Sequence, residues 1–237
     1  MFSRSYAHSH IKKIFNNIFF VTGVNQYVDN YEEHQHSRNM IIVREKGKLS
    51  LINTVRLTEA GLLELDSLGE VENVVRIGTF HGRDDGFYLE RYQAKLWALP
   101  GMKHDDNRQT DFELIPNGPM PFSDCSLFIF KSKVPEAILL KDRTLITCDS
   151  IKNWLDDEFF SQKTAIAYEK AGFFGTATVS KIWRDACQVE LSDFMQLEEF
   201  DFEHLLSAHG APLLNLSKTP LLEHIKDQYC QFTSSKL

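Results

Sequence analysis

Three short polar segments of this sequence carry side chains that could bind a divalent metal ion. The first contains His81 and Asp85, the second Asp149 and the third His209, and each follows a run rich in Val, Ile, Leu or Phe. Such runs are typical of buried β-strands, and strands that end at one sheet edge bring distant residues together. Imidazole and carboxylate groups are ligands for Zn, Mn or Fe. We therefore expect these residues to share a site.

The first half of the chain must supply the strand that ends before His81. Thr58 is a suitable N-cap for a helix that ends at Gly69. Between residues 57 and 99 helix and strand alternate, which is typical of a sheet covered by helices. The predicted strands cover residues 14–21, 40–43, 49–52, 71–77, 95–99 and 112–115, the predicted helices residues 57–69 and 84–93, and a polar loop residues 24–38.

The second half must supply the strands that end before Asp149 and His209. Short turns separate three apolar runs, which predicts antiparallel pairing. The predicted strands cover residues 126–130, 137–140 and 144–147, the predicted helices residues 151–160, 163–171 and 183–197, and residues 202–207 form a strand or helix end. A closing C-terminal helix is expected within residues 217–237, with its apolar residues on one face.

These motifs and the order of the elements resemble the metallo-β-lactamase-fold superfamily over roughly residues 14–215. The family pattern His-x-His-x-Asp-His is read here as His81-x-Arg83-x-Asp85-Gly86. Asp149 matches the family's bridging aspartate, and His209 matches its last histidine, which also precedes a glycine. The family's histidine in a glycine-rich turn has no counterpart in residues 117–122.

The resemblance implies an α/β (α+β) fold, a four-layer αββα sandwich of two mixed β-sheets flanked by helices. It implies no particular activity, because this fold supports many chemistries. Arg83 and Gly86 replace two of the family's histidine ligands, so the metal motif is incomplete and we do not expect a dinuclear centre. One divalent metal, Zn, Mn or Fe, could bind Asp85, Asp149 and His209, with His81 as a further ligand.

The alternative is a site without a cofactor, in which an arginine compensates the charge of the acids. A guanidinium can neutralise a carboxylate through two parallel hydrogen bonds. We therefore expect Arg83 to pair with Asp85 or Asp149. On this interpretation the protein is a non-catalytic binding module with a degenerate site. If a single metal binds instead, the protein is a mononuclear metal-dependent hydrolase of a small ester, amide or phosphoester.

Two further groups of residues are interpreted as structural. His34 and His36 lie in the predicted polar loop, so a solvated pair is expected rather than a metal site. Four phenylalanines between residues 159 and 174 could line a pocket, but packing within a helix pair is favoured. The sequence has neither a nucleophile elbow nor a glycine-rich phosphate loop, which disfavours a serine hydrolase and a nucleotide-binding protein.

Composition limits the remaining function classes. The chain has 237 residues without a linker-like run, so we expect one domain over residues 1–237. Its net charge of −7 disfavours nucleic-acid binding. No signal peptide or membrane span is recognised, and the four cysteines match no metal or redox template, which favours a cytoplasmic protein with reduced thiols. A small-molecule partner and a homo-oligomer stay open.

Overall fold

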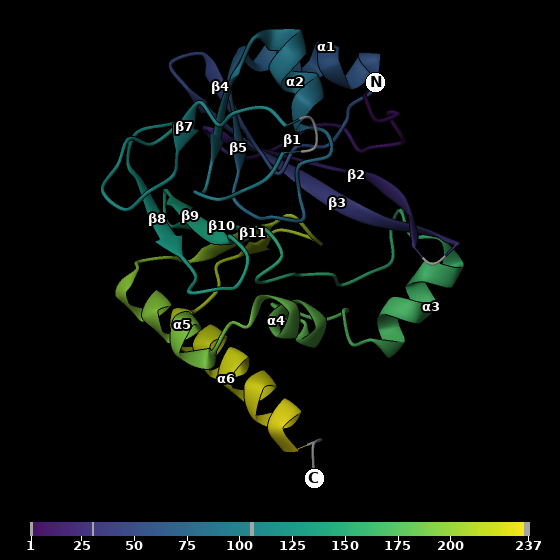
Figure 1. The fold of residues 1–237 in the computed structure, drawn as a ribbon, viewed down its shortest axis with the longest axis vertical. Coiled ribbons are helices and arrows are strands. Elements are labelled where there is room, and N and C mark those ends of the chain that lie inside the picture. Colours follow the sequence, from purple (N-terminus) through teal and green to yellow (C-terminus); the bar gives the residue numbers. More distant parts are fainter. Residues whose placement is uncertain (1, 30, 105–106, 235–237) are drawn as a thin grey trace.

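The computed structural model describes residues 2–29, 31–104 and 107–234. The first sheet along the chain has seven strands in the spatial order β1-β2-β3-β4-β5-β6-β7 (Figure 1). Its strands are antiparallel from β1 to β4 and parallel from β4 to β7. The strands are β1 (Lys12–Phe15), β2 (Ile18–Asp29), β3 (Glu32–Glu45), β4 (Lys48–Ile52), β5 (Glu70–Arg76), β6 (Lys95–Ala98) and β7 (Phe112–Glu113).

The second sheet has five strands in the order β12-β11-β10-β9-β8. β8, β9 and β10 pair antiparallel, as their short turns predict, whereas β10 and β11 are parallel. The strands are β8 (Cys125–Ile129), β9 (Ala137–Lys141), β10 (Thr144–Thr147), β11 (His204–Ser207) and β12 (Leu213–Leu214). The prediction for residues 202–207 is thereby resolved in favour of a strand.

Helices cover the outer faces of both sheets, which confirms the predicted αββα sandwich (Figure 1). α1 and α2 lie against the seven-stranded sheet, while α4, α5 and α6 lie beyond the five-stranded sheet. α3 lies to one side, beside the distal end of the β2–β3 hairpin. The helices are α1 (Glu59–Leu68), α2 (Asp85–Tyr92), α3 (Gln162–Lys170), α4 (Lys181–Cys187), α5 (Leu191–Met195) and α6 (Lys218–Ser234), with a 3-10 turn at Gln196–Glu199.

A continuous apolar core lies between the two sheets. Ile41 and Val75 from the first sheet belong to the same buried cluster as Leu139, Ile146 and Leu206 from the second. Two further clusters lie between each sheet and its own helices. Burial of this apolar surface is the main stabilising contribution in such a sandwich. The core fixes how the strand ends of one sheet face those of the other.

Local sequence signals for the first helix are confirmed. The hydroxyl of Thr58 accepts a hydrogen bond from the Gly61 amide, and α1 ends at Gly69. The closing helix is also confirmed as α6, although residues 235–237 of that prediction lie outside the described residues. None of the helices in the described ranges combines the length and apolar composition that a bilayer crossing requires.

The predicted polar loop over residues 24–38 is wrong, because β2 and β3 continue through it as a long hairpin. Their register runs from Ile18↔Val43 to Asp29↔Glu32. Polar residues dominate the distal half, where the hairpin extends beyond the core, so the usual apolar alternation is weak there. Cross-strand contacts replace it, including the stacked rings of Tyr27 and His34 at 5.0 Å.

Two predicted helices differ from the structure. Residues 151–160, all within the described ranges, form an irregular segment instead, in which Lys152 exchanges backbone hydrogen bonds with Thr178. The predicted helix 183–197 is divided into α4 and α5. Gln188 ends α4 in a left-handed conformation, and a capping box at Glu190 starts α5. In both places hydrogen bonding outside the helix overrides the apolar periodicity.

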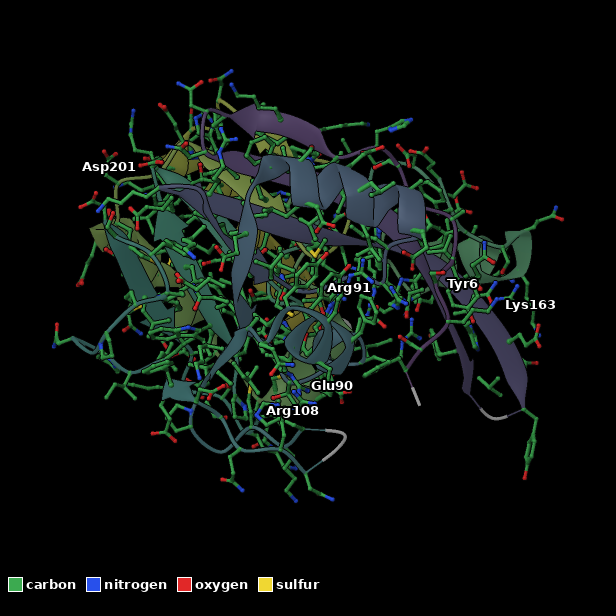
Figure 2. The ribbon with its side chains drawn as sticks, turned by 90° about the horizontal axis from the view of Figure 1, so that it is seen from above. Tyr6, Glu90, Arg91, Arg108, Lys163 and Asp201 are labelled. Atoms are coloured by element: carbon green, nitrogen blue, oxygen red, sulfur yellow. The ribbon has the colours of Figure 1, made fainter. Side chains whose placement is uncertain are left out.

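The loop between β6 and β8 is anchored to the helical layer by an ion pair. Arg108 lies 3.5 Å from Glu90 on α2, and the two residues are labelled next to each other in Figure 2. Such partly exposed pairs contribute little to stability. The predicted short strand in this loop is observed as β7.

Candidate functional site

His81, Asp149 and His209 meet at the edge where β5, β10 and β11 end. His81 lies in the loop between β5 and α2, Asp149 follows β10, and His209 follows β11. β10 and β11 are parallel neighbours, so their carboxyl ends deliver Asp149 and His209 side by side. The packing of the two sheets then places His81 against both. All three side chains are buried.

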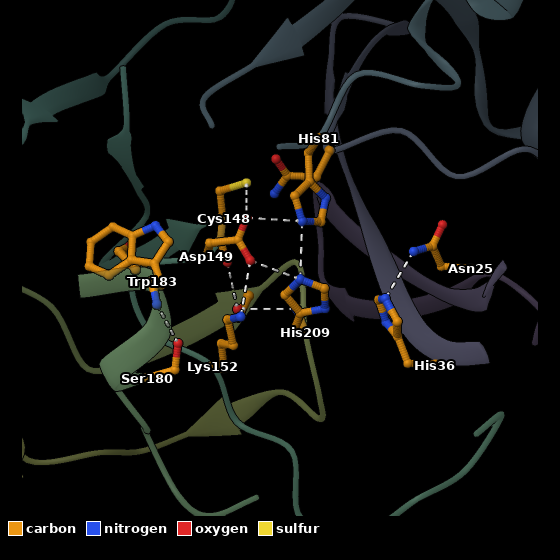
Figure 3. A network of polar contacts seen from close by, with 12 residues as sticks. Asn25, His36, His81, Cys148, Asp149, Lys152, Ser180, Trp183 and His209 are labelled. Carbon is orange, nitrogen blue, oxygen red and sulfur yellow. Dashed lines mark hydrogen bonds and ion pairs between the residues drawn. The ribbon is translucent and has the colours of Figure 1, made fainter. Parts of the chain in front are cut away.

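The polar atoms of these three residues converge on one another (Figure 3). His81 Nε2 lies 3.0 Å from His209 Nε2, and His209 Nε2 lies 3.1 Å from Asp149 Oδ1. His81 Nε2 lies 3.3 Å from the other carboxylate oxygen of Asp149. Three of the four predicted ligands therefore form one triangle of side chains, the donor triangle, in which each imidazole faces a different oxygen of the Asp149 carboxylate.

The orientation of His209 is fixed by its other ring nitrogen. His209 Nδ1 lies 3.4 Å from the carbonyl oxygen of Ser37, which can only accept a hydrogen bond. This contact favours the tautomer with a proton on Nδ1 and a lone pair on Nε2, the arrangement found in metal-bound histidines. Burial lowers the pKa of His209 to about 3, opposed by the neighbouring Asp149 carboxylate. His209 is consequently neutral and can act as a ligand.

Asp149 is ionised, and its charge is compensated by Lys152. Burial alone would raise the pKa of Asp149, but the charge of Lys152, followed by His81, holds it well below its usual value. Lys152 Nζ lies 3.1 Å from Asp149 Oδ1, and both side chains are buried. The charge compensation that the sequence analysis assigned to Arg83 is therefore provided at Asp149 by a lysine.

A second carboxyl group and a thiol lie behind Asp149. Glu136 accepts hydrogen bonds from the backbone amides of Asp149 and Ser150, at 2.9 and 3.0 Å. Burial, followed by the charge of Asp149, raises the pKa of Glu136 well above its usual value. Cys148 is completely buried, and its pKa is also raised, mainly by burial. Burial thus disfavours charge in this layer, and Asp149 is the carboxylate that faces the cavity.

Two glycines permit the close approach of these segments. Gly210 has a φ of +86°, and a Cβ there would lie 2.0 Å from the Asn153 carbonyl oxygen. A Cβ at Gly78 would lie 2.3 Å from Cys148 Sγ. Larger residues at either position would push apart the loops that carry His209, Lys152 and His81.

Asp85, the fourth predicted ligand, lies apart from this triangle. It is the first residue of α2, and its Oδ1 accepts a hydrogen bond of 2.6 Å from the Thr54 hydroxyl. It lines a neighbouring cavity rather than the one at His81 and His209. The start of a helix on the outer layer turns this carboxylate away from the strand ends that carry Asp149 and His209.

Arg83 lies between the two cavities and lines both. Its Nη1 donates a hydrogen bond of 2.7 Å to the Gln26 carbonyl oxygen, and its Nε lies 3.7 Å from Asp84 Oδ1. Asp84 also pairs with the buried Arg38 and accepts a hydrogen bond from the Arg56 amide. The acid that Arg83 approaches in this way is thus Asp84, which the sequence analysis did not single out.

The cavity above the donor triangle has a volume of about 320 Å³. His36, predicted to be solvated, is buried in its wall, with its ring 5.6 Å from that of His209. His36 faces inward because the hairpin continues as strands, which puts His34 and His36 on one face. Phe173 also lines the cavity, so part of the aromatic cluster is a pocket wall rather than packing alone.

Lys152 and His36 were missed for different reasons. The three-residue spacing of Asp149 and Lys152 is visible in the sequence. The predicted helix over residues 151–160, however, would have placed the Lys152 side chain on the protein surface. The spacing of His34 and His36 was recognised, but their segment was assigned to a loop, where this spacing does not put the two side chains on one face. A strand prediction for residues 32–38 would have brought His36 into the site.

The donor triangle fits a divalent metal. Ligand atoms at zinc distances of about 2.0–2.2 Å in a tetrahedron are about 3.3–3.6 Å apart. The three separations here, 3.0, 3.1 and 3.3 Å, are close to that spacing. Cys148 Sγ also lies within 4.8 Å of ligand atoms of His81 and Asp149. His209 lines the cavity, whereas Cys148 lies buried behind Asp149 and does not line it, so His209 is the better third ligand for a metal that is open to the cavity.

Comparison with known proteins identifies relatives by structure alone. No family model matches the sequence, and no curated protein matches it. Metallo-β-lactamase DIM-1, in a crystal exposed to ceftazidime, superposes with a TM-score of 0.62 at 16% identity, covering 95% of this chain and 98% of that one. The mono-zinc form of metallo-β-lactamase FIM-1 from Pseudomonas aeruginosa gives 0.59 at 11% identity, covering 95% and 96%.

A flavo di-iron protein variant from Thermotoga maritima gives a TM-score of 0.60 at 14% identity, covering 92% of this chain and 62% of that one. At such low identity these similarities establish the arrangement of the chain and leave its chemistry open. They agree with the two mixed sheets and flanking helices described above. The chain therefore has the metallo-β-lactamase fold.

Proposed function

We propose that the protein is a mononuclear metal-dependent hydrolase of a small ester, amide or phosphoester, with His81, Asp149 and His209 as ligands. The observation that carries this proposal is the convergence of three buried side chains, whose nitrogen and carboxylate oxygen atoms lie 3.0, 3.1 and 3.3 Å apart. Without a cation, one imidazole must donate a proton to the other at this distance. With a cation, both nitrogen lone pairs and the carboxylate face the same positive charge.

Three protein ligands are typical of catalytic zinc sites, which keep a further position for water or substrate. The positions at which the family motif has two more histidines hold Arg83 and Gly86 here, which favours one metal over two. FIM-1 in its mono-zinc form is a structural relative that holds a single zinc. When bound, a divalent metal supplies Lewis acidity, which polarises a substrate oxygen and acidifies water.

The protein's own residues would position the substrate. The Lys152 ammonium group has three donors, and its contact with Asp149 leaves others for an oxygen of the substrate. The Ser37 carbonyl holds the His209 ring in its ligating orientation. The buried rings of Trp154 and His36 limit access of water from the wall of the cavity.

The second candidate is the non-catalytic binding module, and the Lys152–Asp149 pair favours it. An ammonium group 3.1 Å from the carboxylate already neutralises the charge that would attract a metal. In that case the cavity would bind a small molecule through Lys152 and the two histidines. The two candidates differ in whether a cation is part of the purified protein.

The deciding experiment is metal analysis of protein purified without a polyhistidine tag. We expect roughly one equivalent of Zn, Mn or Fe in the wild type and below about a tenth in Asp149→Asn and His209→Gln, since each removes a ligand. His224→Gln is the matched control, because its imidazole bonds the Thr176 carbonyl away from the cavity. Hydrolysis of para-nitrophenyl esters and phosphates should follow metal content. Metal-free wild type that takes up no added zinc would support the binding module instead.

A further inference from the structure

The cavity at the site has aromatic walls contributed by separate parts of the chain. Tyr27 comes from β2, Phe80 from the loop after β5, and the remaining rings from the segment that follows Asp149. These remaining rings belong to Trp154, Tyr168 and Phe173. Residues from three distant segments thus present ring surfaces to one space of about 320 Å³.

Most of these rings are held in place by polar contacts. The hydroxyl groups of Tyr27 and Tyr168 lie 2.8 Å apart and join the hairpin to α3. Trp154 Nε1 donates a hydrogen bond of 2.9 Å to the Ser37 hydroxyl, and its ring lies 4.5 Å from that of His209. A wall fixed in this way is organised before any ligand binds, which reduces the entropic cost of binding.

Phe80 differs from the other rings because it is largely exposed. Its side chain is 59% accessible although it lines the cavity directly before His81. A large aromatic side chain exposed at a cavity entrance leaves ring surface for a bound molecule to cover. The position next to His81 places that surface beside the donor triangle.

The charges that face the cavity are mainly positive. Arg38, Arg83 and Lys152 line it, and Asp149 is the one acid among the described residues that do so. Lys152 Nζ lies 5.4 Å from the ring centre of Trp154 and 5.1 Å from that of Phe173. An anionic group bound at Lys152 would therefore have an attached ring in contact with these two side chains.

We propose that the natural ligand of this site is a small anion that carries an aromatic ring. Its anionic group lies at Lys152, and its ring packs against Phe80, Trp154 and Phe173. The volume is at the low end of the range for ligand sites, which suits a single ring. This inference rests on the proposed function only because both place the ligand in the same cavity. Neither the ring contacts nor the contact with Lys152 requires a metal.

The test measures dissociation constants by NMR titration with three probes of similar size: benzoate, cyclohexanecarboxylate and benzylamine. We expect benzoate to bind about five- to tenfold more tightly than cyclohexanecarboxylate, since aromatic pairs add attraction beyond buried area. Benzylamine should bind more weakly than either anion. Equal affinity for benzoate and cyclohexanecarboxylate, or tighter binding of benzylamine, would overturn the proposal.

Variants assign the effect to the cavity. Phe80→Leu should reduce the benzoate preference severalfold while keeping an apolar side chain, and Lys152→Gln should weaken both anions together. Tyr31→Ala is the matched control, because Tyr31 is an exposed aromatic residue at the hairpin turn outside the cavity. An unchanged preference in Phe80→Leu would contradict the assigned ring contact.

Each titration is repeated after removal of metal with a chelator. If the ring preference persists in protein that never binds metal, the ligand class stands and the hydrolase proposal fails. If metal binds stoichiometrically and the probes are not distinguished, the hydrolase proposal stands and the ligand class fails.

Discussion

Asp84 and Asp149 are both buried carboxylates near the same sheet edge, yet their surroundings differ in kind. Asp84 pairs with the buried Arg38 and accepts hydrogen bonds from the Arg56 amide and the Ser3 hydroxyl. These partners are held by the fold, and burial, followed by the charge of Arg83, lowers the pKa of Arg38 to about 9. Asp84 therefore acts as a structural anion that keeps a guanidinium inside the protein.

Asp149 instead faces two imidazoles and a lysine at the base of a cavity. Imidazole nitrogens can turn their lone pairs to a cation, which guanidinium and amide groups cannot do. The comparison shows that burial of a carboxylate does not identify a functional site. What distinguishes Asp149 is that its partners can also act as ligands and that the site opens to a cavity.

The largest effect on stability is expected from Asp84→Asn. This change leaves Arg38 buried without its anion, and breaking a buried ion pair costs about 3–5 kcal/mol. Urea denaturation should show this loss with or without added zinc. Asp185→Asn is the control, since its exposed pair with Lys181 contributes less than about 1 kcal/mol. Equal effects of the two substitutions would remove the structural role of Asp84.

The second effect concerns pH and the Asp149 cluster. His209 has a pKa of about 3 when folded and an ordinary value of 6.5. The unfolded chain therefore binds more protons between these values, so the stability that neutral His209 provides is complete above about pH 6.5 and is lost towards pH 3. We expect a loss on the order of 2–4 kcal/mol in metal-free protein.

Urea denaturation of wild type and His209→Gln between pH 7.5 and 4 would measure this contribution. The variant should depend less steeply on pH. Glu136 has a raised pKa and acts in the opposite direction, but it is present in both proteins, so their difference isolates His209. Parallel curves would mean that His209 is not buried in its neutral form.

A third, smaller effect concerns the charge of Lys152 beside the proposed metal position. Lys152→Gln removes a positive charge beside the proposed metal position, so zinc affinity should increase about tenfold. Competition with a chromogenic chelator measures it, with the surface variant Lys163→Gln on α3 as control (Figure 2). Weaker zinc binding in Lys152→Gln would show that the lysine holds Asp149 in place for the metal.

The smallest effect is expected from Arg83→Gln. The Arg83 side chain is 33% exposed, and its Nε lies 3.7 Å from Asp84, so the loss in unfolding free energy should stay below about 1 kcal/mol. A loss as large as that of Asp84→Asn would show that Arg83 compensates the charge of a buried carboxylate despite its partial exposure. Thermal denaturation of both variants in one buffer makes the comparison direct.

Much of the fold could be predicted because its signals are local. The turn before β4, the Thr58 cap and the apolar runs of β5, β9 and β10 each lie within a few residues, where chain geometry alone decides the outcome. The hairpin β2–β3 could not be predicted in full, because its polar half is stabilised by pairing with the partner strand.

The candidate site was predicted in part for the same reason. His81, Asp149 and His209 follow apolar strands, and strand ends can be found along the chain. Asp85 belongs to the same motif as His81, but the start of α2 at that residue takes it to another cavity. Local spacing identified the right residue types. Only the direction of the element that follows, α2, decided that His81 lies at the site and that Asp85 does not.

The sequence by itself determined most of the strands and helices and three donors at strand ends, because periodicity and capping act over short distances. Only the tertiary structure decided that Lys152 neutralises Asp149, that His36 enters the cavity wall and that Asp84 holds Arg38. These contacts join residues whose meeting depends on how two sheets pack and how an irregular segment is hydrogen-bonded. Coulomb energy and burial depend on distances in space, which spacing along the chain does not fix.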